Sequence, residues 1–211
     1  MLAGHKDNEN EAYCHREGES HSSAYLDDAV LKYVNGSSLK ILEVGCGNGS
    51  FAAKLEKQGH QIHGIDVSES GIRIAKKRGL TANFTQSSAY ESFSVLGNAK
   101  FDAIIAIEVI EHLFDPRTFF QNAFDNLVPS GKLILTTPYH GYWKNLAISL
   151  VNGWDKHFSV DWHGGHIKFF SFNTLRRELS KVGFEAIQFE GAGRFSYLWK
   201  SMICVANKPT R

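Results

Sequence analysis

The sequence has few cysteines and no long hydrophobic run, and both absences restrict what the protein can be. Only Cys14, Cys46 and Cys204 occur among its 211 residues, and their spacing resembles no metal-binding motif. This argues against a disulfide-stabilised secreted protein and for a reducing compartment. No apolar run approaches the ~18 residues that a membrane-spanning helix requires, and the N-terminal region has no signal-peptide core. A cytoplasmic protein is expected, while peripheral contact with a membrane stays open.

The charge is balanced, which removes another class of partner. Lysine and arginine together number 23 and the acidic residues 22, so the net charge of +1 creates no strong field for nucleic acid. We therefore expect a small-molecule substrate; the sequence does not indicate the oligomeric state. The length and the 43 % hydrophobic content predict one globular domain at 24–211, after a polar tail at 1–23.

Strand-like and helix-like segments alternate along this domain. Four of the strand-like segments are continuous apolar runs, as in a parallel sheet covered on both faces. The last two predicted strands flank a glycine-containing loop and read as an antiparallel hairpin. We predict an α/β, doubly wound, seven-stranded, mostly parallel sheet with this hairpin at its edge. The expected strands are 39–44, 61–66, 82–86, 101–107, 131–137, 184–189 and 198–206, and the expected helices are 25–34, 50–58, 69–78, 117–127 and 173–182.

A glycine-rich loop follows the first predicted strand. The segment ILEVGCGNGSF places Gly45, Gly47 and Gly49 between a strand and a helix. Glycine lets the backbone turn tightly there and lets a ligand approach without a Cβ in the way. The loop lacks the lysine of a P-loop, and Ser50 stands where a dinucleotide fingerprint has its last glycine. Glu43 adds negative charge where a pyrophosphate would lie, which favours a ligand with a cationic end.

An acidic residue ends the second predicted strand. Asp66 follows Gly49 by 17 positions. A carboxylate at this point of such a sheet accepts hydrogen bonds from both hydroxyls of a ribose. A glycine turn without a ligand and a helix-capping aspartate are the alternatives. The two features together favour binding of a nucleoside that carries a cationic group.

These residues resemble the class I S-adenosylmethionine-dependent methyltransferases, and the resemblance covers residues 39–207. It implies that the glycine loop holds the methionine part of the cofactor and that the end of the second strand holds the ribose. The adenine contact is less typical, because Gln86-Ser87-Ser88-Ala89 lacks the usual aspartate. The cofactor-binding residues implied are Glu43, Gly45, Cys46, Gly47, Gly49, Asp66, Val67, Ser88, Ala89, Ile107 and Glu108.

Charged residues follow the fourth predicted strand directly. In AIEVIEHLFDP, Glu108, Glu111 and His112 stand at i, i+3 and i+4, so an α-helical turn would present all three on one face. Two carboxylates and an imidazole can hold a divalent cation, Mg²⁺ or, with the histidine, Mn²⁺ or Zn²⁺. The alternative is a helix start at which the acidic residues complement the helix dipole.

A second histidine cluster lies in the segment DWHGGH, which contains His163 and His166. Either histidine can complete a metal site or act as a base. His166 is the better candidate because the apolar stretch that follows would fix its position. We predict His112 and His166 as catalytic residues.

Within the superfamily, residues 108–116 and 165–170 resemble the ubiquinone-biosynthesis type of O-methyltransferase. The resemblance implies that Glu108, Glu111 and His112 hold a divalent ion beside a catechol oxygen. The chain departs from that type after the fifth strand, where a tryptophan-rich, lid-like insertion covers about 139–170. Its aromatic residues suit an apolar or aromatic acceptor. We predict S-adenosylmethionine-dependent methylation of a small molecule, at an oxygen.

Two other functions stay open. A family of RNA terminal ribose 2′-O-methyltransferases uses Glu-x-x-Glu-His with a later histidine for Mg²⁺, but this chain shows no basic stripe for RNA. The chain can also be a non-catalytic nucleotide-binding module or an NAD-dependent protein. Binding of S-adenosylhomocysteine without NAD, together with methyl transfer, would exclude both of these last two.

Overall fold

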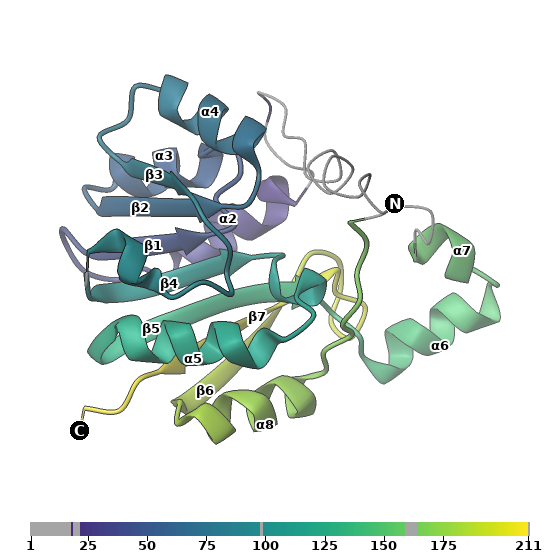
Figure 1. Ribbon diagram of the computed structural model, residues 1–211. Coiled ribbons are helices and arrows are strands. Elements are labelled where there is room, and N and C mark those ends of the chain that lie inside the picture. Colours follow the sequence, from purple (N-terminus) through teal and green to yellow (C-terminus); the bar gives the residue numbers. More distant parts are fainter. Residues whose placement is uncertain (1–17, 19–21, 98, 159–163, 211) are drawn as a thin grey trace, which may run out of the picture.

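A computed structural model describes Gly18 and residues 22–97, 99–158 and 164–210, and the structural statements below concern these residues (Figure 1). The predicted tail at 1–23 lies outside them except for Gly18, Ser22 and Ser23. His163 of the second histidine cluster also lies outside the described residues.

The strands form one seven-stranded sheet in the order β3-β2-β1-β4-β5-β7-β6 (Figure 1). The first five strands are parallel, whereas β7 pairs antiparallel with both β5 and β6. This confirms the predicted fold class and the antiparallel edge hairpin. The strands are β1 (Lys40–Val44), β2 (Gln61–Asp66), β3 (Asn83–Gln86), β4 (Phe101–Ile107), β5 (Leu127–Pro138), β6 (Glu185–Ala192) and β7 (Ser201–Asn207).

Helices cover both faces of the sheet, as the apolar strands predict. Successive residues of β4 face opposite sides of the sheet and belong to different hydrophobic clusters. Ile104 belongs to the cluster that includes residues of α5 and α8, and Ile105 belongs to the cluster that includes residues of α2, α3 and α4. Both side chains are fully buried. The covering helices are α2 (Ser23–Leu31), α3 (Ser50–Lys57), α4 (Glu69–Lys77), α5 (Pro116–Asn126) and α8 (Phe172–Val182).

Several predicted boundaries were wrong by a few residues. Helix α5 ends at Asn126, and β5 begins at Leu127 rather than at Gly131, because Leu127 pairs with Phe101 ahead of a bulge in the β4–β5 register. Strand β7 begins at Ser201 rather than at 198, because Leu198 still belongs to the turn after β6, where its amide donates to the Phe195 carbonyl at 3.0 Å. Helix α2 ends three residues earlier than predicted.

The predicted insertion contains two short helices, α6 (Tyr142–Leu150) and α7 (Trp154–His157). They follow β5, and Figure 1 shows them beyond the carboxyl end of that strand, away from the helices that cover the sheet. The side chains of Tyr142, Trp143 and Leu150 are exposed. None of the described helices has the length and hydropathy required to cross a membrane.

Helix α8 starts with a capping box that can be tested by mutation. The Ser171 hydroxyl accepts the Thr174 amide, and the Thr174 hydroxyl accepts the Ser171 amide. We expect Ser171→Ala to lower the free energy of unfolding by about 1 kcal/mol, measured by urea denaturation. The exposed Ser180→Ala in the same helix is the matched control, and an equal loss in both variants would contradict a capping role.

Candidate active site

The glycine loop between β1 and α3 adopts backbone conformations that favour glycine. Gly45, Gly47 and Gly49 have φ values of 75°, 51° and 73°. A Cβ on Gly45 would lie 2.4 Å from Cγ2 of Val109, which follows β4. The sequence prediction of a tight loop is therefore correct, and the first glycine is also required for packing against the β4 connection.

Asp66 fastens this loop to the end of β2. The Gly47 amide donates to Asp66 Oδ2 at 2.7 Å, and the Ser68 amide donates to Asp66 Oδ1 at 2.7 Å. The aspartate is buried. A carboxylate offers about four lone-pair positions. Each oxygen therefore keeps the capacity to accept one hydroxyl after these two contacts.

Glu43 lies in β1 beneath the same loop and is 4 % exposed. Its Oε2 has no hydrogen-bond partner among the described residues. Burial, with smaller contributions from Asp27 and Asp66, raises the pKa of the Glu43 carboxyl well above its ordinary value. Burial likewise raises the pKa of the neighbouring Cys46 thiol, which keeps this cysteine in its unreactive form.

The remaining predicted cofactor residues lie at the carboxyl ends of β2, β3 and β4. Val67 is exposed, and its carbonyl accepts the Gln86 side-chain amide at 3.0 Å. Ala89 is buried, and the Ser88 hydroxyl accepts the Tyr90 amide at 3.2 Å. Their position at the edge where parallel sheets bind ligands is the predicted one.

Strand β4 ends at Ile107, and the next residue has a strained backbone. Glu108 has φ 54°, which is uncommon for a residue other than glycine. Its amide and Oε1 both bind the Thr136 hydroxyl of β5, at 2.9 and 2.8 Å. Burial raises the pKa of Glu108 to about 7, while Thr136, Ser201 and Lys144 lower it.

Three side chains meet beside this strand end. Ligand atoms of Glu111, His112 and His166 all lie within 4.8 Å of one another. The Glu111 carbonyl accepts hydrogen bonds from the amides of Ile167 and Lys168, both at 2.9 Å. These bonds hold the segment that contains His166 against the turn that contains His112. The predicted association of His112 with His166 is therefore present, and their ring centroids are 4.9 Å apart.

The predicted α-helical turn through Glu108 is not formed. The turn is a three-residue 3₁₀ helix, η2 (Ile110–His112), which begins after Glu108. Among the described residues, the group of possible metal ligands therefore consists of Glu111, His112 and His166. Glu108 is not part of it, because its carboxylate accepts a hydrogen bond from the Thr136 hydroxyl instead. Because Glu108 precedes this turn and has a left-handed backbone conformation with φ 54°, its i, i+3 spacing to Glu111 does not place the two side chains on one helical face.

Burial controls the protonation of this group. Glu111 is fully buried, and neither of its carboxyl oxygens has a hydrogen-bond partner among the described residues. Burial, followed by repulsion from Glu108, raises the pKa of the Glu111 carboxyl well above its ordinary value. The hydroxyl of Thr137 is also buried and makes no hydrogen bond among the described residues. Burial, together with repulsion from nearby histidines and Lys144, lowers the pKa of His166 to about 4. Both observations fit a site that receives a cation.

Three residues of the site were missed by the sequence prediction. Thr136 lies on β5 and Ser201 on β7, and both lower the pKa of Glu108. They are far from Glu108 in the sequence and come close to it only when the sheet forms. Lys144 is the one charged residue of α6 and is 4 % exposed. Its isolation among apolar neighbours was the signal that could have identified it, because a lysine is almost never buried without a partner.

Exposed apolar side chains gather around the same edge. The large exposed apolar residues of the described chain all lie in segments that follow the carboxyl end of β2, β3, β4, β5 or β6. Strand β6 runs parallel to β5, so its carboxyl end lies at the same edge of the sheet. The exposed apolar residues are Val67, Tyr90, Phe114, Tyr142, Trp143, Leu150, Val151, Trp154, Ile167, Phe169, Phe195, Tyr197 and Leu198.

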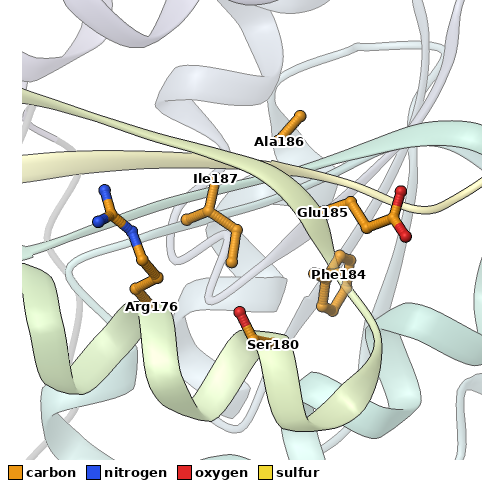
Figure 2. Close-up of a pocket in the computed structure, with 6 residues that line it drawn as sticks. All are labelled: Arg176, Ser180, Phe184, Glu185, Ala186 and Ile187. Carbon is orange, nitrogen blue, oxygen red and sulfur yellow. The ribbon is translucent and has the colours of Figure 1, made fainter.

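A shallow depression of about 430 Å³ lies at the opposite end, between α8 and the start of β6 (Figure 2). None of the predicted site residues lines it.

The fold and the glycine loop define a nucleotide-binding α/β protein of the Rossmann-like class. The same fold occurs in a S-adenosylmethionine-dependent methyltransferase from Archaeoglobus fulgidus, with a TM-score of 0.65 and 17 % identity over 87 % of this chain and 93 % of that one. Residues 19–188 match the methyltransferase domain family, and the chain belongs to that family. The predicted class of S-adenosylmethionine-dependent methyltransferases is thereby confirmed.

Curated relatives share a more specific name. The chain is 35 % identical over 118 residues to a ubiquinone biosynthesis O-methyltransferase of Rickettsia canadensis, covering 54 % of this chain and 49 % of the relative. It is 28 % identical over 162 residues to the protein of that name from Dinoroseobacter shibae, covering 72 % and 62 %. The chain thus spans between about half and two thirds of the length of these relatives.

Proposed function

We propose that the protein transfers the methyl group of S-adenosylmethionine to an oxygen of a small hydroxylated acceptor. The observation that carries this proposal is the group of Glu111, His112 and His166 beside the end of β4. An oxygen acceptor must lose a proton on methylation, and this group offers ways to assist that loss. The names of the curated relatives support oxygen as the accepting atom.

In this proposal the cofactor lies across the glycine loop. Gly45, Cys46, Gly47 and Gly49 contact its methionine part, because their loop follows the carboxyl end of β1, where a parallel sheet binds its ligand. The unpartnered Oε2 of Glu43 suits the cofactor's ammonium group. The other proposed contacts are Asp66 and Val67 with the ribose, Ser88 and Ala89 with the adenine, and Ile107 and Glu108 with the region of the sulfur.

The group of three has the donor chemistry of a divalent cation site. Two imidazoles and one carboxylate suit Zn²⁺ or Mn²⁺ better than Mg²⁺. The fit rests on the two unpartnered Glu111 oxygens and on imidazoles whose pKa values are lowered by burial. A divalent cation bound there lowers the pKa of an acceptor hydroxyl.

The side chains themselves supply the remaining chemistry. A sulfonium is already a good leaving group, so the protein must mainly align the acceptor with the methyl group. The nitrogen His112 Nδ1 lies 3.3 Å from the Gly165 carbonyl. A neutral imidazole that donates there keeps Nε2 unprotonated, able to hold a cation or accept the proton of the acceptor. The exposed apolar rim suits an apolar or aromatic acceptor.

Calorimetry tests the site directly. Mn²⁺ and Zn²⁺ are titrated into EDTA-treated protein saturated with S-adenosylhomocysteine. We expect saturable binding that is lost in Glu111→Gln and in His166→Ala, because each removes one of three ligands. Glu108→Gln is the matched control and should keep binding, since Glu108 is outside the group.

Each other result has a distinct meaning. Loss of binding in Glu108→Gln would restore the ligand set predicted from the sequence. Absence of binding in the unmodified protein would overturn the metal site and leave His112 and His166 as candidate bases. Methyl transfer from labelled S-adenosylmethionine to amines, with none to catechols or other hydroxyl compounds, would overturn the proposed function itself.

A further inference from the structure

The chain leaves β3 through a turn at residues 88–91, called the β3 turn below, which contains the residues proposed to contact the adenine. The Glu91 amide closes this turn by donating to the Ser88 carbonyl at 3.1 Å. Just before the turn, the Ser87 amide donates to the Asp66 carbonyl at 3.0 Å. The turn therefore begins beside the residue proposed to bind the ribose, but no helix or strand passes through it.

Asn122 of α5 binds three consecutive carbonyls of the β3 turn. Its Nδ2 lies 3.4, 3.3 and 3.0 Å from the carbonyl oxygens of Ala89, Tyr90 and Glu91. A side-chain amide has two N–H donors, so the three oxygens share them. Carbonyl oxygens that converge in this way repel one another unless a donor lies between them. The conformation of the β3 turn therefore depends on the Asn122 amide.

Tyr90 ties the same turn to the beginning of α5. Its hydroxyl oxygen accepts hydrogen bonds from the amides of Phe114 and Asp115, the second at 3.3 Å. Asp115 is the N-cap of α5, and its Oδ1 accepts the Arg117 amide at 3.2 Å. The helix is itself fixed to the sheet, because one of its faces is fully buried. The buried residues of that face are Phe119, Phe120 and Ala123.

The polar side chains next to the β3 turn are bound within the protein. The Gln86 side chain donates to the Val67 carbonyl at 3.0 Å, and the Ser87 hydroxyl donates to Glu91 Oε2 at 2.9 Å. A base that lies against the turn is therefore recognised mainly by backbone groups, and their positions depend on the conformation of the turn. A turn held in one conformation before the ligand arrives binds it more tightly, because the cost of ordering the backbone does not oppose binding.

We propose that Asn122 and Tyr90 are positioning residues for the cofactor: they hold the β3 turn in the conformation that receives the adenine. Asn122 acts from within α5, and Tyr90 acts through the chain just before that helix. This inference rests on the proposed function, in which Ser88 and Ala89 contact the adenine. It gives α5 a role in cofactor binding, although the sequence predicted no cofactor contact from this helix.

The test compares S-adenosylhomocysteine with S-ribosylhomocysteine, which lacks the adenine. Both affinities are measured by calorimetric titration, the weaker ligand in competition with the stronger. Asn122→Asp keeps the size of the side chain and removes its N–H donors. We expect the unmodified protein to prefer S-adenosylhomocysteine by at least 100-fold, and Asn122→Asp to lower the affinity for that ligand about tenfold. The affinity for S-ribosylhomocysteine should stay within about twofold, because this ligand has no base to contact the β3 turn.

Asn126→Asp is the matched control. Asn126 lies one turn further along α5, and its Nδ2 donates to the Asn122 carbonyl at 2.8 Å, not to the β3 turn. The variant brings the same charge into the same helix, so both affinities should stay within about twofold. Tyr90→Phe keeps the test valid if Asn122→Asp does not fold. It removes one hydroxyl from an exposed residue and should cause the same selective loss of affinity for S-adenosylhomocysteine.

The outcomes separate this inference from the proposed function. Equal affinities for the two ligands in the unmodified protein would remove the adenine from the β3 turn and overturn the positioning role with it. An undiminished preference for S-adenosylhomocysteine in Asn122→Asp, or an equal loss of affinity for both ligands, would overturn the positioning role alone and make Asn122 a structural link. Methyl transfer to hydroxyl compounds is measured separately and tests only the proposed function.

Discussion

Replacing Asp66 with alanine is expected to lower the affinity for S-adenosylhomocysteine by at least 100-fold. Two ribose hydroxyls would lose a charged acceptor, and each such hydrogen bond contributes about 1.5–3 kcal/mol. The variant should also lose about 2–4 kcal/mol of unfolding free energy, because the buried amides of Gly47 and Ser68 lose their acceptors. Calorimetric titration measures the first effect and urea denaturation the second.

Asp102 provides a matched control for this prediction. Its Oδ2 accepts the Lys40 amide at 2.8 Å, so it also holds a strand in place, but at the amino end of β1 and β4. Asp102→Ala should therefore reduce stability while leaving the affinity for S-adenosylhomocysteine within about twofold. Equal losses of affinity in both variants would mean that Asp66 acts only through the fold.

The fold could be predicted because its signals are local. Four of the predicted strands are continuous apolar runs, and the strands pair in an order that short connections and covering helices permit. The start of β5 could not be predicted, because Pro129 and Gly131 read as a loop. The pairing of Leu127 with Phe101 and of Ser130 with Lys208 overrides that local signal.

The candidate site was predictable only as far as neighbouring residues define it. The loop glycines and Asp66 could be recognised from spacing along the chain. The partnership of Glu111 with His166 depends on a connection that folds back over more than 50 residues. The predicted α-helical relation of Glu108 to Glu111 was wrong because Glu108 lies before the 3₁₀ helix and has a φ of 54°, which is outside the right-handed helical range. Thr136 reaches the site through sheet geometry, which leaves no local sequence pattern, whereas Lys144 stood out as the one charged residue of its helix.

The ligand-free protein is expected to lose stability as the pH rises above about 4.5, and Glu43 should be one cause. Burial and the neighbouring Asp27 and Asp66 place the pKa of Glu43 in the folded protein above its unfolded value. Between those two values the folded protein holds a proton that the unfolded chain has released. Its stabilising effect is therefore complete below the unfolded pKa and falls as the pH rises, by up to about 1.4 kcal/mol per pH unit.

Glu43→Gln isolates this contribution. The pKa values of Glu108 and Glu111 are also raised, so they give the unmodified protein a slope of the same sign that persists in the variant. The free energy of unfolding of each protein is measured by urea denaturation at pH 5, 6 and 7. The difference between the two proteins should change with pH as expected for the titration of one carboxyl group. Parallel stability curves would show that Glu43 titrates alike in the folded and unfolded states.

The same carboxyl should couple proton release to cofactor binding. An ammonium group placed against the unpartnered Oε2 favours the charged form of Glu43, so S-adenosylhomocysteine should displace its proton. Calorimetry in two buffers of different ionisation enthalpy measures that release directly. We expect about one proton more per ligand from the unmodified protein than from Glu43→Gln. Equal release from both would place the cofactor's ammonium group away from β1, because a buried carboxyl that meets a new positive charge cannot keep its proton unaffected.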